Sequence, residues 1–416
     1  MALTIGGPES FLPAGPAAPM LQLSIEPSFL RSRENVMSAF KSPLKIARRI
    51  RQMRRAARVA RQMAVFGAAV SVGVGATAYA LRRHRTIDLL DRVVVITGGS
   101  RGLGLALAEE CARRGAKVAI CARDPEELEI ARRQVRYKFA GEVLADVCDV
   151  TRTKDVESFL DAVLSRFGQI DVLINNAGVI SVGPAESQTL ADYEEAMNTM
   201  YWGVVYPTLS ALPHMKKRGG GRIANIASIG GKIAVPHLLP YTAAKFATVG
   251  FSEGLRSELL KDGIRVTTVC PGLMRTGSHL NAHFKGQHRR EFGWFSFGAT
   301  MPLVSIDVRR AARKIIAAIR AGDAELVITP QAKVAAHLHG LFPGLTTDVL
   351  GVVNRLLPKA GWDRAERHVG RESHSWLTKS FLQHMGERAA REWNQNGDST
   401  VETGKLESRW QGDVSA

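Results

Sequence analysis

The stretch TGGSRGLG at residues 97–104 decides the fold class of this chain, because it joins an apolar run to a segment with helical spacing. The run before it, RVVVI, has the β-branched composition of a buried strand, and LALAEECARRG after it has the spacing of a helix. Glycines in such a turn allow a tight bend and let backbone N–H groups approach phosphate at the helix N-terminus. A glycine-rich turn alone is a weak signal, but this strand–turn–helix setting predicts a nucleotide site.

The same alternation of strand and helix continues to about residue 330. The runs with strand character are RVVVITGG, AKVAICAR, IDVLINNAG, GGRIANIAS, IRVTTVCPG and AELVITP. Nearly unbroken apolar strands that alternate with helices predict a parallel sheet covered on both faces, an α/β, Rossmann-type doubly wound fold. Ligands of such a sheet bind at the carboxyl ends of its strands. We therefore expect a single catalytic domain over residues 86–330, with an extension at each end.

The end of the second strand indicates which dinucleotide binds. KVAICAR ends at Ala122 and Arg123, near the spacing where an acid would bind the ribose hydroxyls of NAD, and Asp124 follows only after the arginine. Arg123 and Arg101, from the glycine turn, have the charge to pair with the 2′-phosphate of NADP. Either arginine alone is more typical of a solvated surface charge. Together they predict NADP(H) as the cofactor.

Three polar residues farther along have the spacing of a catalytic set. Ser228 precedes Tyr241 by thirteen residues and Lys245 follows it by four, so Tyr241 and Lys245 share one helix face. A phenol has a pKa of about 10 and is a poor acid–base group at neutral pH. An adjacent ammonium and an oxidised nicotinamide would favour its phenolate form. Tyr-x-x-x-Lys arises often by chance, so its weight comes from its order among the other motifs.

Residues from about Asp91 to Pro330 resemble the short-chain dehydrogenase/reductase family. The resemblance rests on TGGSRGLG, Asp149-Val150, NNAG at 175–178, Ser228, YTAAK and PG at 271–272, in that order. It implies that Tyr241 donates a proton to a carbonyl oxygen, that Ser228 hydrogen-bonds this oxygen, and that Lys245 binds the nicotinamide ribose and lowers the pKa of Tyr241. With Arg123, Tyr241 and Lys245, the cofactor-binding residues are then Gly98, Ser100, Arg101, Gly102, Leu103, Gly104, Asp149, Val150, Asn176, Ala177, Gly178, Pro271, Gly272 and Thr276.

The sequence departs from the family at Met200. The family carries a catalytic Asn three residues before the glycine of Asn-x-x-Gly, and counting back from Gly203 gives Met200. Asn198 lies about 200° around a helix from that position, so its side chain does not substitute. In the family the Asn acts largely through its backbone carbonyl, which holds a water toward the lysine. Two hypotheses follow: Met200 preserves this water, or the protein is a catalytically weak, NADP-binding scaffold or sensor at a membrane.

The front of the chain differs from the body. Residues 1–40 are rich in Pro, Gly and Ala and predict a disordered arm. Residues 41–63 hold nine Lys or Arg and no acid, which is typical of a basic amphipathic helix on an anionic membrane, or of a solvated basic arm. Residues 63–81 are uncharged, so a bilayer-spanning and a surface-bound helix both stay open. We expect residues 41–85 to associate with a membrane and the catalytic domain to face the cytoplasm, where the reductant is.

Charge and cysteine content argue against other classes of function. The formal net charge is +17, but residues 1–92 hold 15 Lys or Arg against 5 Asp or Glu, so most of the surplus precedes the body. Residues 41–62 lack the interleaved aromatics of a nucleic-acid binder, and no specific nucleic acid is expected. The four cysteines are scattered and lack histidine partners at metal spacing, so we expect buried thiols and no metal site.

Aromatic residues after the PG turn suggest the substrate class. In this fold the segment covers the substrate, and it contains Phe284, Phe292, Trp294, Phe295 and Phe297. They predict either a lid over an apolar, lipid-like ketone or aldehyde, or a segment that packs on its own domain. The histidines nearby have no ligand spacing and are expected to be solvated: His279, His283 and His288.

The C-terminal part is divided at residue 394. Residues 331–393 predict a helical extension, which could contact a membrane, cover the substrate mouth or form a subunit interface. Residues 394–416 are polar and predict a disordered tail. The family resemblance implies a homodimer or homotetramer, assembled through the helices that carry Met200 and Tyr241.

Overall fold

The computed structural model describes residues 43–301, 305–361, 365–373 and 389–395. The predicted arm over residues 1–40 lies outside the described residues, as do residues 396–416 of the predicted tail. Contacts divide the chain into two units, Met1–Ala78 and Tyr79–Ala416.

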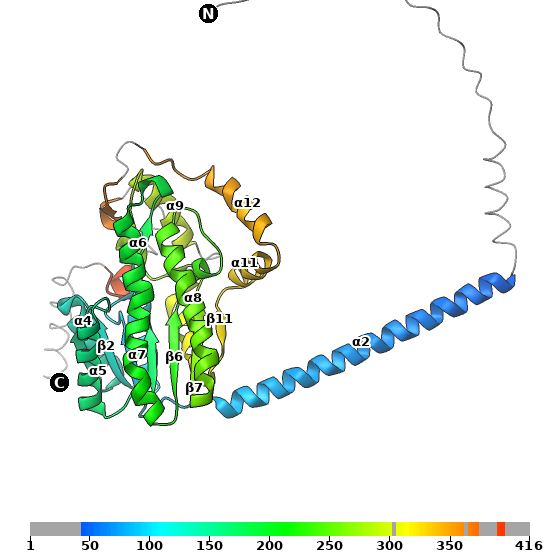
Figure 1. The fold of residues 1–416 in the computed structure, drawn as a ribbon, viewed down its shortest axis with the longest axis horizontal. Helices are drawn as coiled ribbons and strands as arrows, with labels where there is room; N and C mark the ends of the chain where they lie inside the picture. Colours follow the sequence, from blue (N-terminus) through cyan, green and yellow to red (C-terminus); the bar gives the residue numbers. More distant parts are fainter. Residues whose placement is uncertain (1–42, 302–304, 362–364, 374–388, 396–416) are drawn as a thin grey trace, which may run out of the picture. The chain divides into compact units, whose positions relative to one another are not determined.

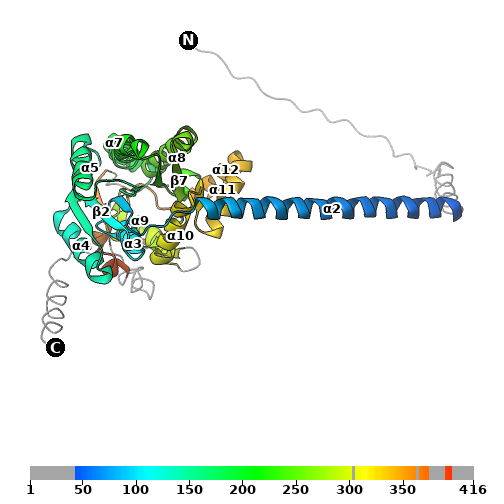
Figure 2. The same cartoon turned by 90° about the horizontal axis from the view of Figure 1, so that it is seen from below.

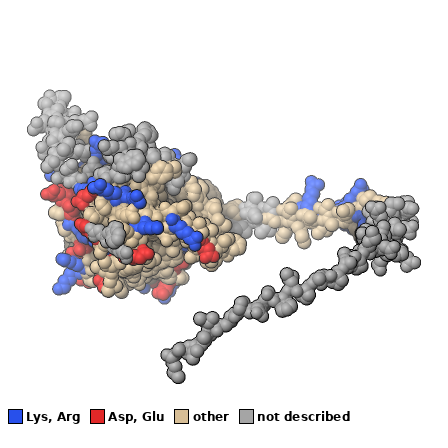
Figure 3. All heavy atoms as spheres, turned by 90° about the horizontal axis from the view of Figure 1, so that it is seen from above, with Lys and Arg blue, Asp and Glu red and all other residues tan. Residues whose placement is uncertain are grey.

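The basic and the uncharged segments of the front form one continuous helix, α2 (Pro43–Arg85). Its described side chains are almost all exposed, including those of Met53, Met63 and Phe66. Figure 3 shows Lys and Arg side chains along this helix without acidic ones between them. Within the described residues, no helix contains a stretch long and apolar enough to cross a membrane.

The body is built on a seven-stranded parallel sheet, with strand order β11-β7-β6-β4-β1-β2-β3. The predicted α/β, doubly wound fold is confirmed. The strands are β1 (Val93–Thr97), β2 (Lys117–Ala122), β3 (Val143–Val147), β4 (Val172–Asn175), β6 (Gly221–Ile226), β7 (Ile264–Cys270) and β11 (Glu325–Val327). The sequence missed β3, because this edge strand is only half-buried and Asp146 interrupts its apolar pattern.

Helices cover both faces of the sheet, as Figures 1 and 2 show. Alternation along β1 directs Val94 and Ile96 to one core and Val93 and Val95 to the other. The first core lies under α3 (Gly102–Ala112), α4 (Pro125–Phe139) and α10 (Val308–Ala321). The second lies under α5 (Thr153–Phe167), α7 (Gly203–Lys217) and α8 (Leu239–Leu259). The four cysteines are buried and unpaired, which confirms the prediction of buried thiols.

The long helix predicted after NNAG is interrupted. α6 (Leu190–Met197) ends in a π-helical turn, Asn198–Trp202, before α7 continues at Gly203. The N–H of Gly203 donates to the Asn198 carbonyl, five residues back. A π-turn inside a helix frequently marks a functional site, and this one contains Met200.

Short elements surround the carboxyl edge of the sheet. A three-stranded sheet joins β5 (Ser181–Val182), β9 (His283–Phe284) and β12 (His368–Val369), while β8 (Met274–Arg275) pairs with β10 (Ile306–Asp307). α9 (His288–Thr300) follows β9. The C-terminal extension begins with α11 (Pro330–Leu341) and α12 (Pro343–Asn354), which pack against each other. Their large apolar side chains are mostly exposed: Val334, Leu338, Leu341, Phe342, Leu345, Val349, Val352 and Val353.

Candidate active site

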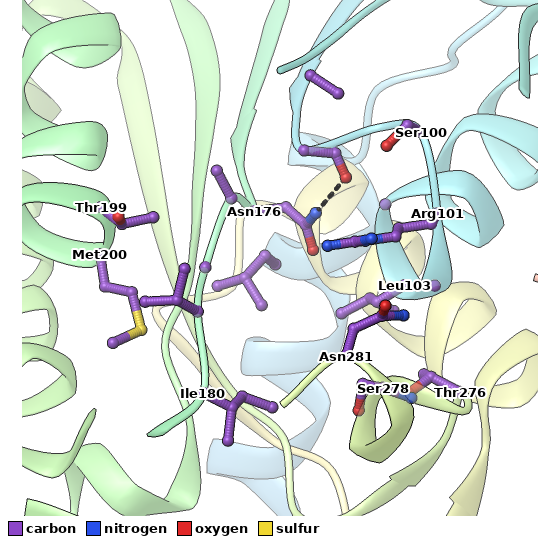
Figure 4. A pocket seen from close by; sticks show the side chains of 18 of the residues that line it. Ser100, Arg101, Leu103, Asn176, Ile180, Thr199, Met200, Thr276, Ser278 and Asn281 are labelled. Atoms are coloured by element: carbon purple, nitrogen blue, oxygen red, sulfur yellow. Dashed lines mark hydrogen bonds between the residues drawn. The ribbon is translucent and has the colours of Figure 1, made fainter. Parts of the chain in front are cut away.

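A cavity of about 460 Å³ lies at the carboxyl edge of the sheet. Every residue that the sequence assigns to cofactor binding or catalysis lines it, from Gly98 in the glycine turn to Thr276 after β8. In Figure 4, Ser100, Arg101 and Leu103 lie at one end of the cavity, and Thr199 and Met200 lie at the other. The fold therefore brings segments that are far apart in sequence to one site.

The glycine turn is packed too closely for side chains. A Cβ atom on Gly104 would lie 2.0 Å from the Gly98 carbonyl oxygen and 2.6 Å from Asn176 Nδ2. Asn176 Nδ2 donates to the Thr97 and Gly98 carbonyls at 3.1 and 2.9 Å, and Figure 4 marks a hydrogen bond of this residue. Among the described residues, the N–H groups of Leu103 and Gly104 at the start of α3 have no acceptor. Such free N–H groups favour an anion.

The two arginines at the adenosine end differ in their surroundings. Arg101 donates to Glu127 Oε1 at 2.8 Å, so its charge is already paired. Arg123 is exposed at the cavity wall and makes no ion pair within the described part of the chain. Asp124 caps α4 by accepting from the Glu126 and Glu127 N–H groups. The guanidinium of Arg123 is therefore available to a phosphate.

The three predicted catalytic side chains meet at the inner end of the cavity. Ser228 follows β6, while Tyr241 and Lys245 lie on the first turns of α8. Lys245 Nζ donates to the Ile226 carbonyl at 2.7 Å and lies 5.8 Å from the centre of the Tyr241 ring. Burial raises the pKa of Tyr241 and is opposed by a hydrogen bond from Ser228. Burial lowers the pKa of Lys245 to about 8.

Met200 sits in the π-turn with its backbone carbonyl facing α8. Thr248 Oγ1 donates to this carbonyl at 2.7 Å and also to the Ala244 carbonyl at 2.9 Å. The Met200 side chain is fully buried, and its sulfur would lie 3.7 Å from a Cβ placed on Gly178. This hydrogen bond joins the backbone of the π-turn to α8.

The aromatic side chains of the segment after the PG turn do not line the cavity. Phe284, Phe292 and Phe295 are buried against one another with edge-to-face contacts, and Phe297 is exposed. Of the two expectations, the structure favours a segment that packs on its own domain. The cavity wall near Tyr241 is formed instead by Val179, Ile180, Met200, Ala282 and His283.

The expectation that the three nearby histidines are solvated is wrong for His279, while His283 and His288 are half-buried. His279 is buried, and His288 stacks on His368 at 3.8 Å. His283 lies in the cavity wall, where burial and the neighbouring Arg367 lower its pKa. Among the described residues, no group of three or more His, Cys, Asp or Glu side chains could hold a metal ion.

Comparison with known proteins places this site in a family. A family model described as short chain dehydrogenase matches residues 92–284. SadH of Mycobacterium tuberculosis, named as an oxidoreductase, is 36% identical over 245 residues, 58% of this chain and 87% of that protein. The 11-beta-hydroxysteroid dehydrogenase-like 2 protein of Arabidopsis thaliana is 35% identical over 241 residues, 58% of this chain and 74% of that protein. The chain belongs to the short-chain dehydrogenase family.

The three-dimensional structure of this chain is also similar to a solved structure. L-sorbose reductase from Gluconobacter frateurii, complexed with NADPH and L-sorbose, aligns with a TM-score of 0.53 and 27% identity, over 58% of this chain and 97% of that chain. The protein is therefore a dehydrogenase/reductase enzyme, and the shared part is the Rossmann body. The alignment with L-sorbose reductase does not include the remaining part of this short-chain dehydrogenase.

The sequence did not single out two residues of this short-chain dehydrogenase that contribute to the site: Thr248, which contacts the Met200 carbonyl, and Gln395, which lines the cavity. Thr248 lies three residues after Lys245, which puts it on the same side of α8, toward the π-turn. That spacing was visible in the sequence, although its hydrogen-bond partner was not. Gln395 belongs to residues 394–416, which the sequence predicts to be a disordered tail, yet it lines the cavity. No local sequence pattern identifies it as a site residue.

The Thr248 hydroxyl can be tested by an isosteric substitution. We expect Thr248→Val to lower the free energy of unfolding by about 1–2 kcal/mol, because the buried Met200 carbonyl loses its donor. We also expect kcat to fall more than KM changes, because the carbonyl would move relative to Lys245. Thr248→Ser keeps the hydroxyl and should restore both values. Urea unfolding and steady-state kinetics measure the two effects, and an unchanged kcat in the Val variant would assign Thr248 to stability alone.

We expect the charge on Lys245 to make cofactor affinity depend on pH. Its pKa is lowered to about 8, so the ammonium form is present below that pH and is lost above it. We expect the Kd for NADPH to rise as pH increases through about 8, as measured by fluorescence titration. Lys245→Arg stays charged and should flatten the profile. Lys245→Met should bind weakly at every pH, and a wild-type Kd that stays constant through this range would show that the charge is not used.

Proposed function

We propose that this enzyme is an NADP(H)-dependent reductase of apolar carbonyl compounds, able to run in reverse as an alcohol dehydrogenase. The observation that carries the proposal is the convergence of Ser228, Tyr241 and Lys245 on the cavity that the glycine turn also lines. A carbonyl carbon placed between this set and a nicotinamide has both a proton donor and a hydrogen-bond donor at its oxygen.

The proposed roles follow from the local chemistry. NADPH, when bound, supplies the hydride. Ser228 donates a hydrogen bond to the carbonyl oxygen as negative charge develops there, and Tyr241 delivers its phenolic proton to the same oxygen. Burial raises the pKa of Tyr241, which keeps the phenol protonated at neutral pH and suits the reducing direction. Lys245 is the only one of the three that is cationic, and it would hold the nicotinamide ribose.

The preference for NADP(H) rests on Arg123. Its guanidinium is exposed at the adenosine end, while Asp124 is engaged in capping α4. The cofactor of the related L-sorbose reductase structure is NADPH, which is consistent with this choice. The remaining proposed cofactor residues line the same cavity: Gly98, Ser100, Arg101, Gly102, Leu103, Gly104, Asp149, Val150, Asn176, Ala177, Gly178, Pro271, Gly272 and Thr276.

An apolar substrate is proposed from the cavity wall and not from the aromatic segment. Val179, Ile180, Met200 and Ala282 form the wall near Tyr241. One relative is named for a hydroxysteroid and another for a sugar, so the names of relatives do not decide the class. We also propose that α2 binds an anionic membrane surface, because it carries many basic and exposed apolar side chains and no acid. The catalytic domain would then work at the cytoplasmic face of that membrane, as a homodimer or homotetramer.

A second candidate function is a catalytically weak, NADP-binding scaffold or sensor at the membrane. Met200 favours it, because the family's Asn is replaced at that position. The hydrogen bond from Thr248 to the Met200 carbonyl favours the enzyme instead, because it fixes the backbone group through which the Asn would act.

The reductase proposal predicts NADPH oxidation with hydrophobic ketones and aldehydes. We expect Tyr241→Phe to lower kcat/KM by about three orders of magnitude or more, and Ser228→Ala by about two to three, without a change in NADPH affinity. Tyr206→Phe, a tyrosine stacked on Trp202 outside the cavity, is the matched control and should be unaffected. If wild-type protein reduces no compound of the panel and Met200→Asn gains activity, the scaffold is the better assignment.

The cofactor proposal predicts a selective loss in Arg123→Ala. Removing one charge-assisted contact to the 2′-phosphate should raise the KM for NADPH about tenfold or more and leave the KM for NADH nearly unchanged. Arg136→Ala, on an exposed position of α4, is the control for general loss of positive charge. Equal losses for both cofactors would contradict the assignment of Arg123 to the 2′-phosphate.

A further inference from the structure

A short C-terminal segment, Ala389–Gln395, crosses the cofactor end of the cavity. It is drawn in red in Figure 1, near α4, and Gln134 on α4 donates to its Glu392 carbonyl. Gln395 is one of the residues that line the cavity. We call this segment the strap, because it joins the glycine turn to the loop on the substrate side.

Two glycines make room for the strap. A Cβ on Gly102, in the glycine turn, would lie 2.6 Å from Gln395 Nε2. A Cβ on Gly277, on the substrate side, would lie 2.6 Å from both the Cα and the Cβ of Ala390. Both glycines also have positive φ, at 57° and 78°. A side chain at Gly102 would displace the Gln395 amide, and one at Gly277 would displace the backbone of the strap.

Backbone hydrogen bonds attach the strap to the glycine turn. The Gly102 N–H donates to the Trp393 carbonyl at 2.9 Å. Asn394 Nδ2 donates to the carbonyls of Ser100 and Glu127, at 3.1 and 3.0 Å. The strap thus takes one N–H of the turn and leaves those of Leu103 and Gly104 for a ligand.

Trp393 holds the strap in the core. Its side chain is 2% exposed, belongs to the apolar cluster beneath α3 and α10, and lies 5.5 Å under the guanidinium of Arg309. Burying a tryptophan stabilises a segment far more than a surface ion pair does. The strap is therefore a fixed part of the cavity wall.

The Gln395 side chain is oriented by its own contacts. It is 4% exposed, and its Oε1 accepts from Asn281 Nδ2 at 2.6 Å. The Gln395 backbone carbonyl accepts from the same amide group at 2.8 Å. With Oε1 engaged in this way, Nε2 is directed to the glycine turn, and within the described residues it has no acceptor. Figure 4 shows Asn281 on the same side of the cavity as Thr276 and Ser278.

We propose that the strap completes the dinucleotide site, and that Gln395 Nε2 donates to the cofactor diphosphate beside the free N–H groups of Leu103 and Gly104. This inference rests on the proposed function, because it requires that the cavity binds a dinucleotide. The ligand chemistry follows from position: an amide donor and two helix N–H groups converge on one region, which suits an anionic oxygen. Gln395 orients the cofactor and takes no part in hydride or proton transfer.

The test compares Gln395→Glu and Gln395→Ala in the full chain. Glutamate has the same shape and places a negative charge beside the diphosphate, so we expect at least a tenfold rise in the Kd for NADP⁺ and NADPH. Alanine removes only the donor and should raise the Kd by a smaller factor. Glu392→Gln is the matched control, because this residue of the strap pairs with Arg309 away from the cavity. Adenosine 2′-monophosphate, which lacks the diphosphate, should bind all variants equally.

The binding measurements separate three alternatives: a role of Gln395 in diphosphate binding, a purely structural role of the strap, and a failure of the proposed function. Equal NADP⁺ affinity in wild type and Gln395→Glu overturns the role of Gln395 and leaves the proposed function intact. A parallel loss of NADP⁺ and adenosine 2′-monophosphate binding also overturns it, because the strap then only supports the fold. Thermal melting without cofactor checks that the variants are folded. A wild-type protein that binds neither NADP⁺ nor NAD⁺ overturns the proposed function and this inference together.

Discussion

The whole site depends on one close approach, between the first turn of α3 and the loops that follow β1 and β4. The Gly98 carbonyl and the Asn176 amide occupy the space that a side chain at Gly104 would need. This contact fixes the start of α3 relative to the sheet, and with it the direction of the free N–H groups. The same contact, together with the hydrogen bonds from Asn176 to the Thr97 and Gly98 carbonyls, links the strand ends, the glycine turn and the NNAG loop. Pre-organisation of this kind limits the ordering cost of binding a long, flexible dinucleotide.

At the other end of the cavity, burial decides the chemistry. Lys245 and Tyr241 are both shifted toward their uncharged forms, because the helix α8 carries them into the sheet edge. The family mechanism assigns Lys245 the task of lowering the pKa of Tyr241. In this structure the net effect on Tyr241 is a raised pKa, since desolvation outweighs the hydrogen bond from Ser228. The positive charge of an oxidised nicotinamide would lower the pKa of Tyr241 again. A protonated Tyr241 beside the reduced cofactor therefore suits carbonyl reduction, and an ionised Tyr241 beside the oxidised cofactor suits alcohol oxidation.

The parts of the chain outside the family likeness contribute to the site as well as surround it. The strap is anchored by Trp393 and reaches the glycine turn through Gln395, although it comes from beyond the matched residues 92–284. Likewise, where Met200 replaces the Asn of the family, Thr248 donates a hydrogen bond to the Met200 backbone carbonyl. In both cases the site is completed by a contact that the family motifs do not contain.

The sequence by itself determined the sheet class, six of the strands, the glycine turn and the proposed catalytic and cofactor residues of the cavity other than Gln395. The sheet class, the strands and the glycine turn follow from short-range rules, since apolar periodicity and glycine placement are local properties. The catalytic residues and most of the cofactor residues follow from the order of motifs that this chain shares with the short-chain dehydrogenase family. Only the tertiary structure decided that α6 and α7 are separated by a π-turn, that Arg101 is paired with Glu127, and that the aromatic segment packs on itself. It alone placed Gln395 in the cavity. Such contacts join residues far apart in the chain, and their formation depends on three-dimensional packing that no local pattern contains.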